Sequence, residues 1–173
     1  MTDRAEKRVE ESRVTMTRLM RPQHSNFADN VHGGTILSLM DEVAYMCAAK
    51  YAEAYCVTAA IDRVEFESPV RVGEEVTLEA AVHAVGTSSM QVGIDVHAEN
   101  PQEPESGRRT NRSFFTMVAL DDGGDTTEVP RLVCETEEER RLRVEAELRE
   151  ELWEELEAQL DEGMCELEPA AGG

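Results

Sequence analysis

The sequence predicts an α+β fold, in which one long helix lies against one face of an antiparallel sheet. Three observations lead to this prediction. One segment has helical periodicity, one strand-like segment precedes it, and a run of four strand-like segments follows it. With 173 residues, the chain is long enough to bury a core without disulfides or a structural metal.

The predicted elements follow in order along the chain. A loosely alternating strand over 12–20 is followed by a polar loop and then by a helix over 35–51. The apolar face of this helix has spacings of three and four and comprises Leu37, Met40, Ala44, Cys47, Ala48 and Tyr51. Further strands are expected over 57–67, 75–85, 89–98 and 109–120, with turns at 69–74, 86–88 and 121–124 and a loop over 100–107.

The charge divides the chain into two parts. Residues 1–134 carry a net charge of −9, and residues 135–173, here called the acidic tail, carry −11 of the total of −20. We therefore expect a folded body over 1–134 and a helical extension whose end, 168–173, is disordered. Thr136 and Glu139 fit a capping box at its start. A narrow apolar stripe follows, formed by Leu148, Leu152, Leu156 and Leu160 with Trp153 beside it.

The composition also limits the cellular location and the binding partners that we expect for the protein. So acidic a chain is not expected to bind nucleic acid or an anionic membrane through its overall field. No apolar stretch is long enough for a membrane span and the start of the chain lacks a signal-peptide pattern, so we expect a cytoplasmic protein. Only Lys7 and Lys50 are lysines, which favours a halophilic origin; an ordinary protein with an acidic tail is the alternative.

The cysteines predict neither a zinc site nor a redox motif. Cys47, Cys56, Cys134 and Cys165 form no C-x-x-C pair. Cys47 falls in the apolar helix and is expected to be a small core residue.

The candidate chemistry lies at the start of the helix. Gly33 and Gly34 follow His32, and free N–H groups there can bind an anion or a polarised carbonyl oxygen; a tight turn is the alternative. Asp41 falls on the apolar face by its spacing, so we do not expect it to reach solvent easily. It is either bonded to a strand backbone or positioned to activate water for acyl transfer.

Several motifs together resemble the hot-dog-fold acyl-CoA thioesterases, in the acyl-CoA hydrolase branch. In chain order they include Met20-Arg21-Pro22, Asn26, Asn30-Val31-His32-Gly33-Gly34, Leu39-Met40-Asp41-Glu42, Val57-Thr58-Ala59, Val70-Arg71-Val72-Gly73, Ser88-Ser89-Met90 and Phe114-Phe115-Thr116. The resemblance spans roughly residues 12–145.

This resemblance implies a sheet wrapped around a central helix, a dimer with active sites at its interface, and a homohexamer assembled as a trimer of dimers. It implies hydrolysis of acyl-CoA to fatty acid and coenzyme A, with no metal or other cofactor. Asn30 and Asp41 match the family's asparagine and helix carboxylate, one from each subunit. Asp41 would act as general base for water, or attack directly. The thioester carbonyl would face Gly33 and Gly34, and His32 would add a hydrogen bond or simply pack.

Binding the coenzyme A phosphates requires local cations. Arg71 is the first candidate, followed by Arg63, Arg108, Arg109 and Arg112, while Thr87, Ser88 and Ser89 offer backbone and hydroxyl contacts. A surface ion pair is the alternative for each arginine. Two other functions remain open on the same fold: a non-catalytic regulator that binds acyl-CoA, and an enoyl-CoA hydratase-type enzyme using His32. The sequence does not fix the acyl chain length.

Overall fold

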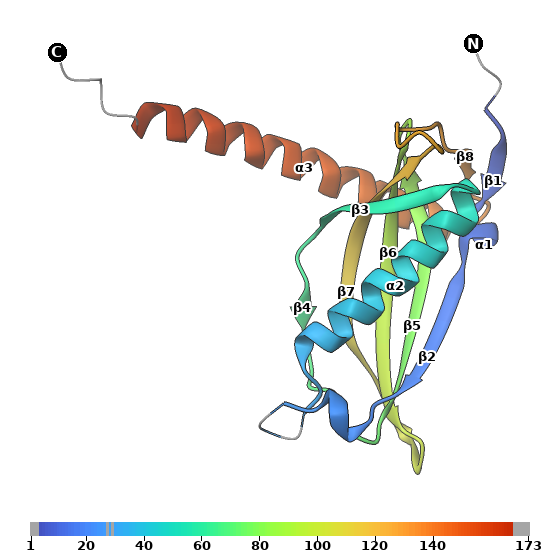
Figure 1. Cartoon of the computed structure of the whole chain (residues 1–173), viewed down its shortest axis with the longest axis vertical. Coiled ribbons are helices and arrows are strands. Elements are labelled where there is room, and N and C mark those ends of the chain that lie inside the picture. Colours follow the sequence, from blue (N-terminus) through green and yellow to red (C-terminus); the bar gives the residue numbers. More distant parts are fainter. Residues whose placement is uncertain (1–3, 27, 29, 168–173) are drawn as a thin grey trace.

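An antiparallel sheet curls around helix α2 (Gly33–Ala52) in the computed structural model of the chain, which describes residues 4–26, 28 and 30–167 (Figure 1). The sheet is six-stranded, in the order β2-β5-β6-β7-β3, with β4 also paired to β7. Its strands are β2 (Val14–Leu19), β3 (Tyr55–Ile61), β4 (Glu65–Phe66), β5 (Glu75–Val85), β6 (Ser89–Asn100) and β7 (Glu103–Leu120). The predicted α+β hot-dog architecture is confirmed.

Helix α2 is held in place by one apolar face packed on the sheet. Met40, Val43 and Cys47 are completely buried, and Cys47 is therefore the core residue that the sequence predicts. The sheet meets them with alternate positions of its central strands, because strand side chains alternate between the two faces. These inward side chains include Leu78 of β5, Met90, Val92 and Ile94 of β6, and Phe115 and Met117 of β7.

Three local predictions differ from the structure. The strand expected over 57–67 is interrupted between β3 and β4, and Leu37 is only half-buried. The loop expected over 100–107 is wrong, because β6 and β7 form one hairpin in which Asn100 pairs with Glu103. Pro101 occupies the turn of this hairpin, where its fixed φ is tolerated, so the proline that suggested a loop marks a two-residue connection.

Two short strands, one near each end of the folded body, form a second sheet. Strand β1 (Glu6–Arg8) pairs in parallel with β8 (Arg131–Val133), and this pairing has no signal in the sequence. The short helix α1 (Val9–Ser12) and the 3-10 turn η1 (Pro22–His24) complete the N-terminal part. No helix in the described part of the chain is long and apolar enough to cross a membrane.

Helix α3 (Glu137–Leu167) packs on the face of the sheet opposite α2 and then projects away from the body (Figure 1). The predicted capping box is present, since Glu139 N–H donates to Thr136 Oγ1 at 3.1 Å and Thr136 N–H to Glu139 Oε2 at 3.0 Å. Ala146 is buried against Ala84 and Phe114. The leucine stripe is exposed in the single chain. The disorder expected over 168–173 lies outside the described residues.

Candidate active site

The start of α2 is capped by His32. Its backbone is extended, its carbonyl accepts from Thr35 N–H at 2.9 Å, and its Nδ1 accepts from Gly34 N–H at 3.4 Å. The two glycines thus form the first turn of a helix of 20 residues, as the sequence predicts. N–H groups of a first turn have no backbone acceptor within the helix, so the Gly33 N–H is open to a bound oxygen. The Gly34 N–H can serve the same oxygen only when its long bond of 3.4 Å to His32 Nδ1 gives way.

The loop before this cap is closed by Asn26 and Asn30. Asn26 Oδ1 accepts from the N–H of Ala28 at 2.9 Å and of Asn30 at 3.3 Å, and Asn26 N–H donates to Asn30 O at 2.7 Å. Asn30 also forms an isolated bridge with Arg71. Both asparagines are half-buried. The loop that carries them is paired back to the helix cap, because His32 N–H donates to His24 O at 2.9 Å and Ser25 bridges Val31.

Asp41 is exposed in the single chain, and the expectation that it could not easily reach solvent is wrong. The physical reason is that the flank of α2 next to edge strand β3 is not covered by this chain. There, Thr58 Oγ1 of β3 donates to Asp41 Oδ1 at 2.6 Å. A hydroxyl donated to a carboxylate fixes its orientation and leaves its second oxygen available.

Thr58 is the residue that sequence reasoning did not assign. It was part of the Val57-Thr58-Ala59 motif, but its pairing with Asp41 needs β3 to run beside α2. A threonine facing a helix carboxylate has no local sequence signal, because the two positions are 17 residues apart.

One chain does not bring Asp41 to the glycines. Asp41 stands eight residues after Gly33, which at the helical rise per residue corresponds to about 12 Å along the axis. A general base must lie within hydrogen-bond reach of the attacking water. The carboxylate and the N–H donors of one helix are therefore too far apart to serve the same carbonyl within one chain.

The surroundings of Asp41 fit a contact between two copies of the chain. Tyr45 and Met46 on α2 are 41% and 40% exposed, and Tyr55 and Ile61 on β3 are 60% and 41% exposed. β3 is also an end strand of the sheet, so one of its edges has no partner strand in the described chain. Apolar side chains beside an open edge are typical of a surface that pairs.

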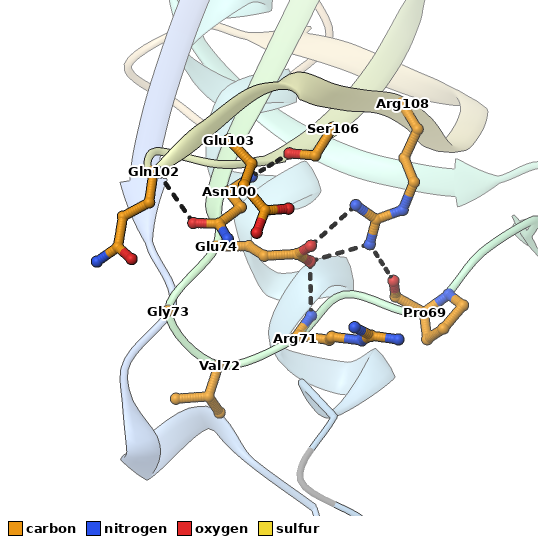
Figure 2. Close-up of a pocket in the computed structure, with 10 residues that line it drawn as sticks. All are labelled: Pro69, Arg71, Val72, Gly73, Glu74, Asn100, Gln102, Glu103, Ser106 and Arg108. Atoms are coloured by element: carbon orange, nitrogen blue, oxygen red, sulfur yellow. Dashed lines mark hydrogen bonds and ion pairs between the residues drawn. The ribbon is translucent and has the colours of Figure 1, made fainter.

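Arg71 lies in a cleft of about 500 Å³ below the β6–β7 hairpin (Figure 2). Arg108 is nearby but engaged, because its guanidinium donates to Glu74 Oε1 and Oε2 at 2.9 Å each and to Pro69 O. Arg71 N–H donates to Glu74 Oε2 at 2.8 Å, whereas its guanidinium makes no ion pair with any residue described. Arg71 is therefore the cation of this cleft that a phosphate can use.

Burial by itself would raise the pKa of the Glu74 carboxyl, but other contacts reverse this effect. The hydrogen bonds from Arg108 and from the Arg71 N–H, with the charges of both arginines, outweigh burial and hold the pKa below its usual value. Glu74 thus remains ionised and keeps Arg108 in a structural role.

The other coenzyme A candidates are distributed differently. Arg63 pairs with Glu65, Arg109 with Glu67, and Arg112 with Asp95 and Glu145, which is the alternative that the sequence left open. Thr87 and Ser88 lie in the turn after β5 and Ser89 begins β6, whereas Arg71 lies just before β5. An 11-residue strand extends roughly 35 Å, so one chain does not bring these residues to Arg71.

The buried cysteines do not supply a nucleophile. Burial raises the pKa of the Cys47 thiol to about 12 and of the Cys56 thiol to about 11. Both thiols are therefore protonated at neutral pH, and the thiolate is the reactive form.

Comparison with known proteins agrees with this fold. Residues 28–105 match the family model described as Thioesterase superfamily. The chain is 39% identical over 132 residues to the uncharacterized acyl-CoA thioester hydrolase YkhA of Bacillus subtilis, covering 76% of each chain. The chain therefore belongs to the thioesterase superfamily.

Two solved structures are similar over nearly their whole length. An apo-hexameric acyl-CoA thioesterase has a TM-score of 0.85 and 38% identity, with 89% of this chain and 98% of that chain covered. An acyl-CoA hydrolase from Staphylococcus aureus, solved with butyryl coenzyme A, coenzyme A and coenzyme A disulfide, has a TM-score of 0.83 and 30% identity, with 95% and 99% covered. The likeness includes helix α3, and it places this chain with the acyl-CoA thioester hydrolases of the family.

Proposed function

We propose that the protein hydrolyses acyl-CoA thioesters to a free carboxylate and coenzyme A, at sites built from two copies of the chain. The observation that carries this proposal is the hydroxyl-oriented carboxylate of Asp41, bonded to Thr58 at 2.6 Å, beside an uncovered surface. A second copy supplies the helix start that one chain leaves about 12 Å away.

The reaction follows from these groups. The thioester carbonyl oxygen accepts from the N–H groups of Gly33 and Gly34 of one subunit, which stabilise the negative charge that develops on it. Asp41 of the other subunit takes a proton from water as the water oxygen bonds to the carbonyl carbon. The carbon–sulfur bond of the tetrahedral intermediate then breaks, and the leaving coenzyme A thiolate takes the proton from Asp41, which restores the carboxylate. The acid product loses its own proton to solvent. Thr58 holds Asp41 in position throughout.

We further propose Asn26, alongside the expected Asn30, as the amide that orients the water or the carbonyl. Variants of the Staphylococcus aureus hydrolase replace an asparagine, an aspartate fifteen positions later and a threonine seventeen positions after that. In this chain Asn26, Asp41 and Thr58 have the same spacings, whereas Asn30 is eleven residues before Asp41. The common spacing supports Asn26.

The assembly is proposed as a homodimer that pairs at β3, three of which form a hexamer. The open edge of β3 and the exposed Tyr45, Met46 and Ile61 support the dimer, and the hexameric thioesterase supports the larger assembly. Arg71 is proposed to hold a coenzyme A phosphate. The cytoplasmic location and the halophilic origin stay predictions.

Release of free thiol from acyl-CoA tests the function directly. The wild-type protein should release coenzyme A from straight-chain substrates, and Asp41→Asn should lose activity by about a hundredfold or more while keeping its fold and oligomeric mass. Glu42→Gln, an exposed neighbour on α2, is the matched control. Wild-type turnover in Asp41→Asn, or binding of acyl-CoA without thiol release by the wild type, would contradict the proposal.

A further inference from the structure

The aromatic ring of Phe66 lies against the first residue of α2. A Cβ atom placed on Gly33 would stand 3.2 Å from Phe66 Cζ and 3.4 Å from Cε1. Real Cβ contacts are seldom so close, so a methyl group at position 33 would have to displace the Phe66 ring by a few tenths of an ångström. The ring thus borders the position at which the proposed function places the thioester carbonyl.

Phe66 is also exposed, with 55% of its surface open to solvent in the single chain. An aromatic side chain of this size gains substantially from burial. The tip of the ring lies at the helix start, and more than half of the residue surface is open. An exposed ring beside this position is suited to contact an apolar ligand.

The backbone around Phe66 is rigidly held. Phe66 pairs with Asn111 of β7, and the fully buried Asn111 donates through Nδ2 to Glu65 O at 3.0 Å. Glu67 N–H donates to Thr110 O at 2.9 Å. The two-residue strand β4 is therefore anchored to β7 on both sides of Phe66, so the backbone from which the ring projects is held in place.

We infer that Phe66 determines acyl specificity, as a fixed wall against the carbon atom next to the thioester carbonyl. This inference rests on the proposed hydrolysis at Gly33 and Gly34. A hydrocarbon matches the apolar ring better than the amide-containing pantetheine arm does. An unbranched carbon fits beside the ring, whereas a methyl branch at that carbon meets it, so the enzyme prefers straight acyl chains to their 2-methyl isomers.

Isomeric substrates test this wall. Butyryl-CoA and 2-methylpropanoyl-CoA contain the same atoms and differ only in the branch, and decanoyl-CoA and 2-methylnonanoyl-CoA form a second pair. The measured quantity is the ratio of kcat/KM for the branched isomer to that for the straight isomer. Phe66→Ala should raise this ratio about tenfold, as a pocket that gains room for one methyl group allows. Phe66→Leu should raise it less.

Leu19→Ala is the matched control, because Leu19 on β2 is 50% exposed and lies on the opposite edge strand. It should leave the ratio unchanged. A second test uses Gly33→Ala, whose methyl group meets the ring. This variant should recover part of its lost activity when combined with Phe66→Ala, so the two substitutions should be strongly non-additive.

The possible outcomes distinguish a failure of the Phe66 inference from a failure of the proposed hydrolysis. No thiol release by the wild type overturns the proposed hydrolysis. If the wild type hydrolyses the substrates but Phe66→Ala leaves the ratio of branched to straight kcat/KM unchanged, the specificity role of Phe66 is wrong while the proposed hydrolysis stands. A uniform rise of KM for all four substrates would assign Phe66 to the pantetheine arm and also overturn it. Additive effects of Gly33→Ala and Phe66→Ala would contradict the contact.

Discussion

Thr58 Oγ1 donates a hydrogen bond of 2.6 Å to Asp41 Oδ1, from an edge strand to an exposed flank of the central helix. The carboxylate thus has one oxygen fixed by the protein and one free. We expect Thr58→Val, which keeps the shape of the side chain and removes the donor, to lower kcat about tenfold with little change in KM.

Thr58→Ser is the control for this prediction, since serine retains the hydroxyl and should recover most of the activity. Steady-state rates with one straight-chain acyl-CoA suffice for the measurement. Equal rates in the valine and wild-type proteins would show that orientation of Asp41 by Thr58 does not matter.

The two loop asparagines can be separated by substitution. Asn26→Ala should lower kcat by about a hundredfold and also loosen the loop, because it removes the Oδ1 that accepts from the N–H groups of Ala28 and Asn30. Asn30→Ala keeps the backbone bonds of Asn30 and should have a smaller effect on both. Thiol release and thermal unfolding should be measured on both variants. A larger loss of kcat in Asn30→Ala, with an unchanged melting temperature, would restore Asn30 to the role that the sequence motif gave it.

The two arginines of the cleft in Figure 2 should behave differently. Arg108→Ala breaks a bidentate pair with the largely buried Glu74 and should destabilise the fold by about 2 kcal/mol. Arg71→Ala should leave stability nearly unchanged and raise KM for acyl-CoA. Denaturant unfolding and steady-state kinetics measure the two effects. An unchanged KM would remove Arg71 from the phosphate site.

Lowering the pH should lower the free energy of unfolding, because His83 must then be protonated. Its side chain is 7% exposed, packs on Phe114 and rests over Gly93, and burial, followed by the charge of Arg112, lowers its pKa to about 4. The unfolded chain binds this proton near pH 6.5 and the folded chain only near pH 4, so stability falls as the pH drops between these values. Below pH 4 this contribution to the pH dependence ends. The loss should reach about 3 kcal/mol.

Unfolding measured between pH 5 and pH 6.5 isolates His83, because the ionised carboxylates titrate mostly below this window. His83→Phe should flatten the dependence, and His97→Gln, which changes an exposed histidine on β6, should not. If the free energy of unfolding of His83→Phe still falls with pH in this window, a group other than His83 causes the dependence.

The acidic composition predicts a dependence on salt. With a net charge of −20, the folded chain repels itself, and salt screens this repulsion as the Debye length shrinks from about 10 Å at 0.1 M to about 3 Å at 1 M. The free energy of unfolding and the affinity for acyl-CoA should both rise with salt, up to a point. Potassium chloride titrations with chemical unfolding and steady-state kinetics check this. Full stability in low salt would contradict the halophilic interpretation.

The sequence predicted the parts of the fold that depend on local periodicity. The helix began at the predicted glycines, and β5 has the bounds expected from alternation and turns. One failure involves two distant segments, because the β1–β8 pair is three residues long on each side and too short for a pattern. The other is local, because the prolines at the β6–β7 hairpin indicated a loop where the structure has a two-residue connection.

The site was predictable only in part, because distant segments also meet in it. The motif located Asp41, Gly33 and Gly34, but helical spacing placed Asp41 among buried residues when its flank of α2 is open. Thr58 and Phe66 gain their positions from the curl of the sheet, which brings β3 and β4 beside α2. Neither contact can be derived from spacing along the chain.

Asp62 connects the acidic tail to the substrate site. Its two carboxylate oxygens accept from Arg149 and from the Trp153 indole of α3 at 2.7 Å each, and it stands only four residues before Phe66. The C-terminal helix is therefore a brace for the wall of the acyl site rather than a removable appendage. If Phe66 sets selectivity as inferred, a shift of this helix should change selectivity through Asp62 and through the Glu145–Arg112 pair beside β4.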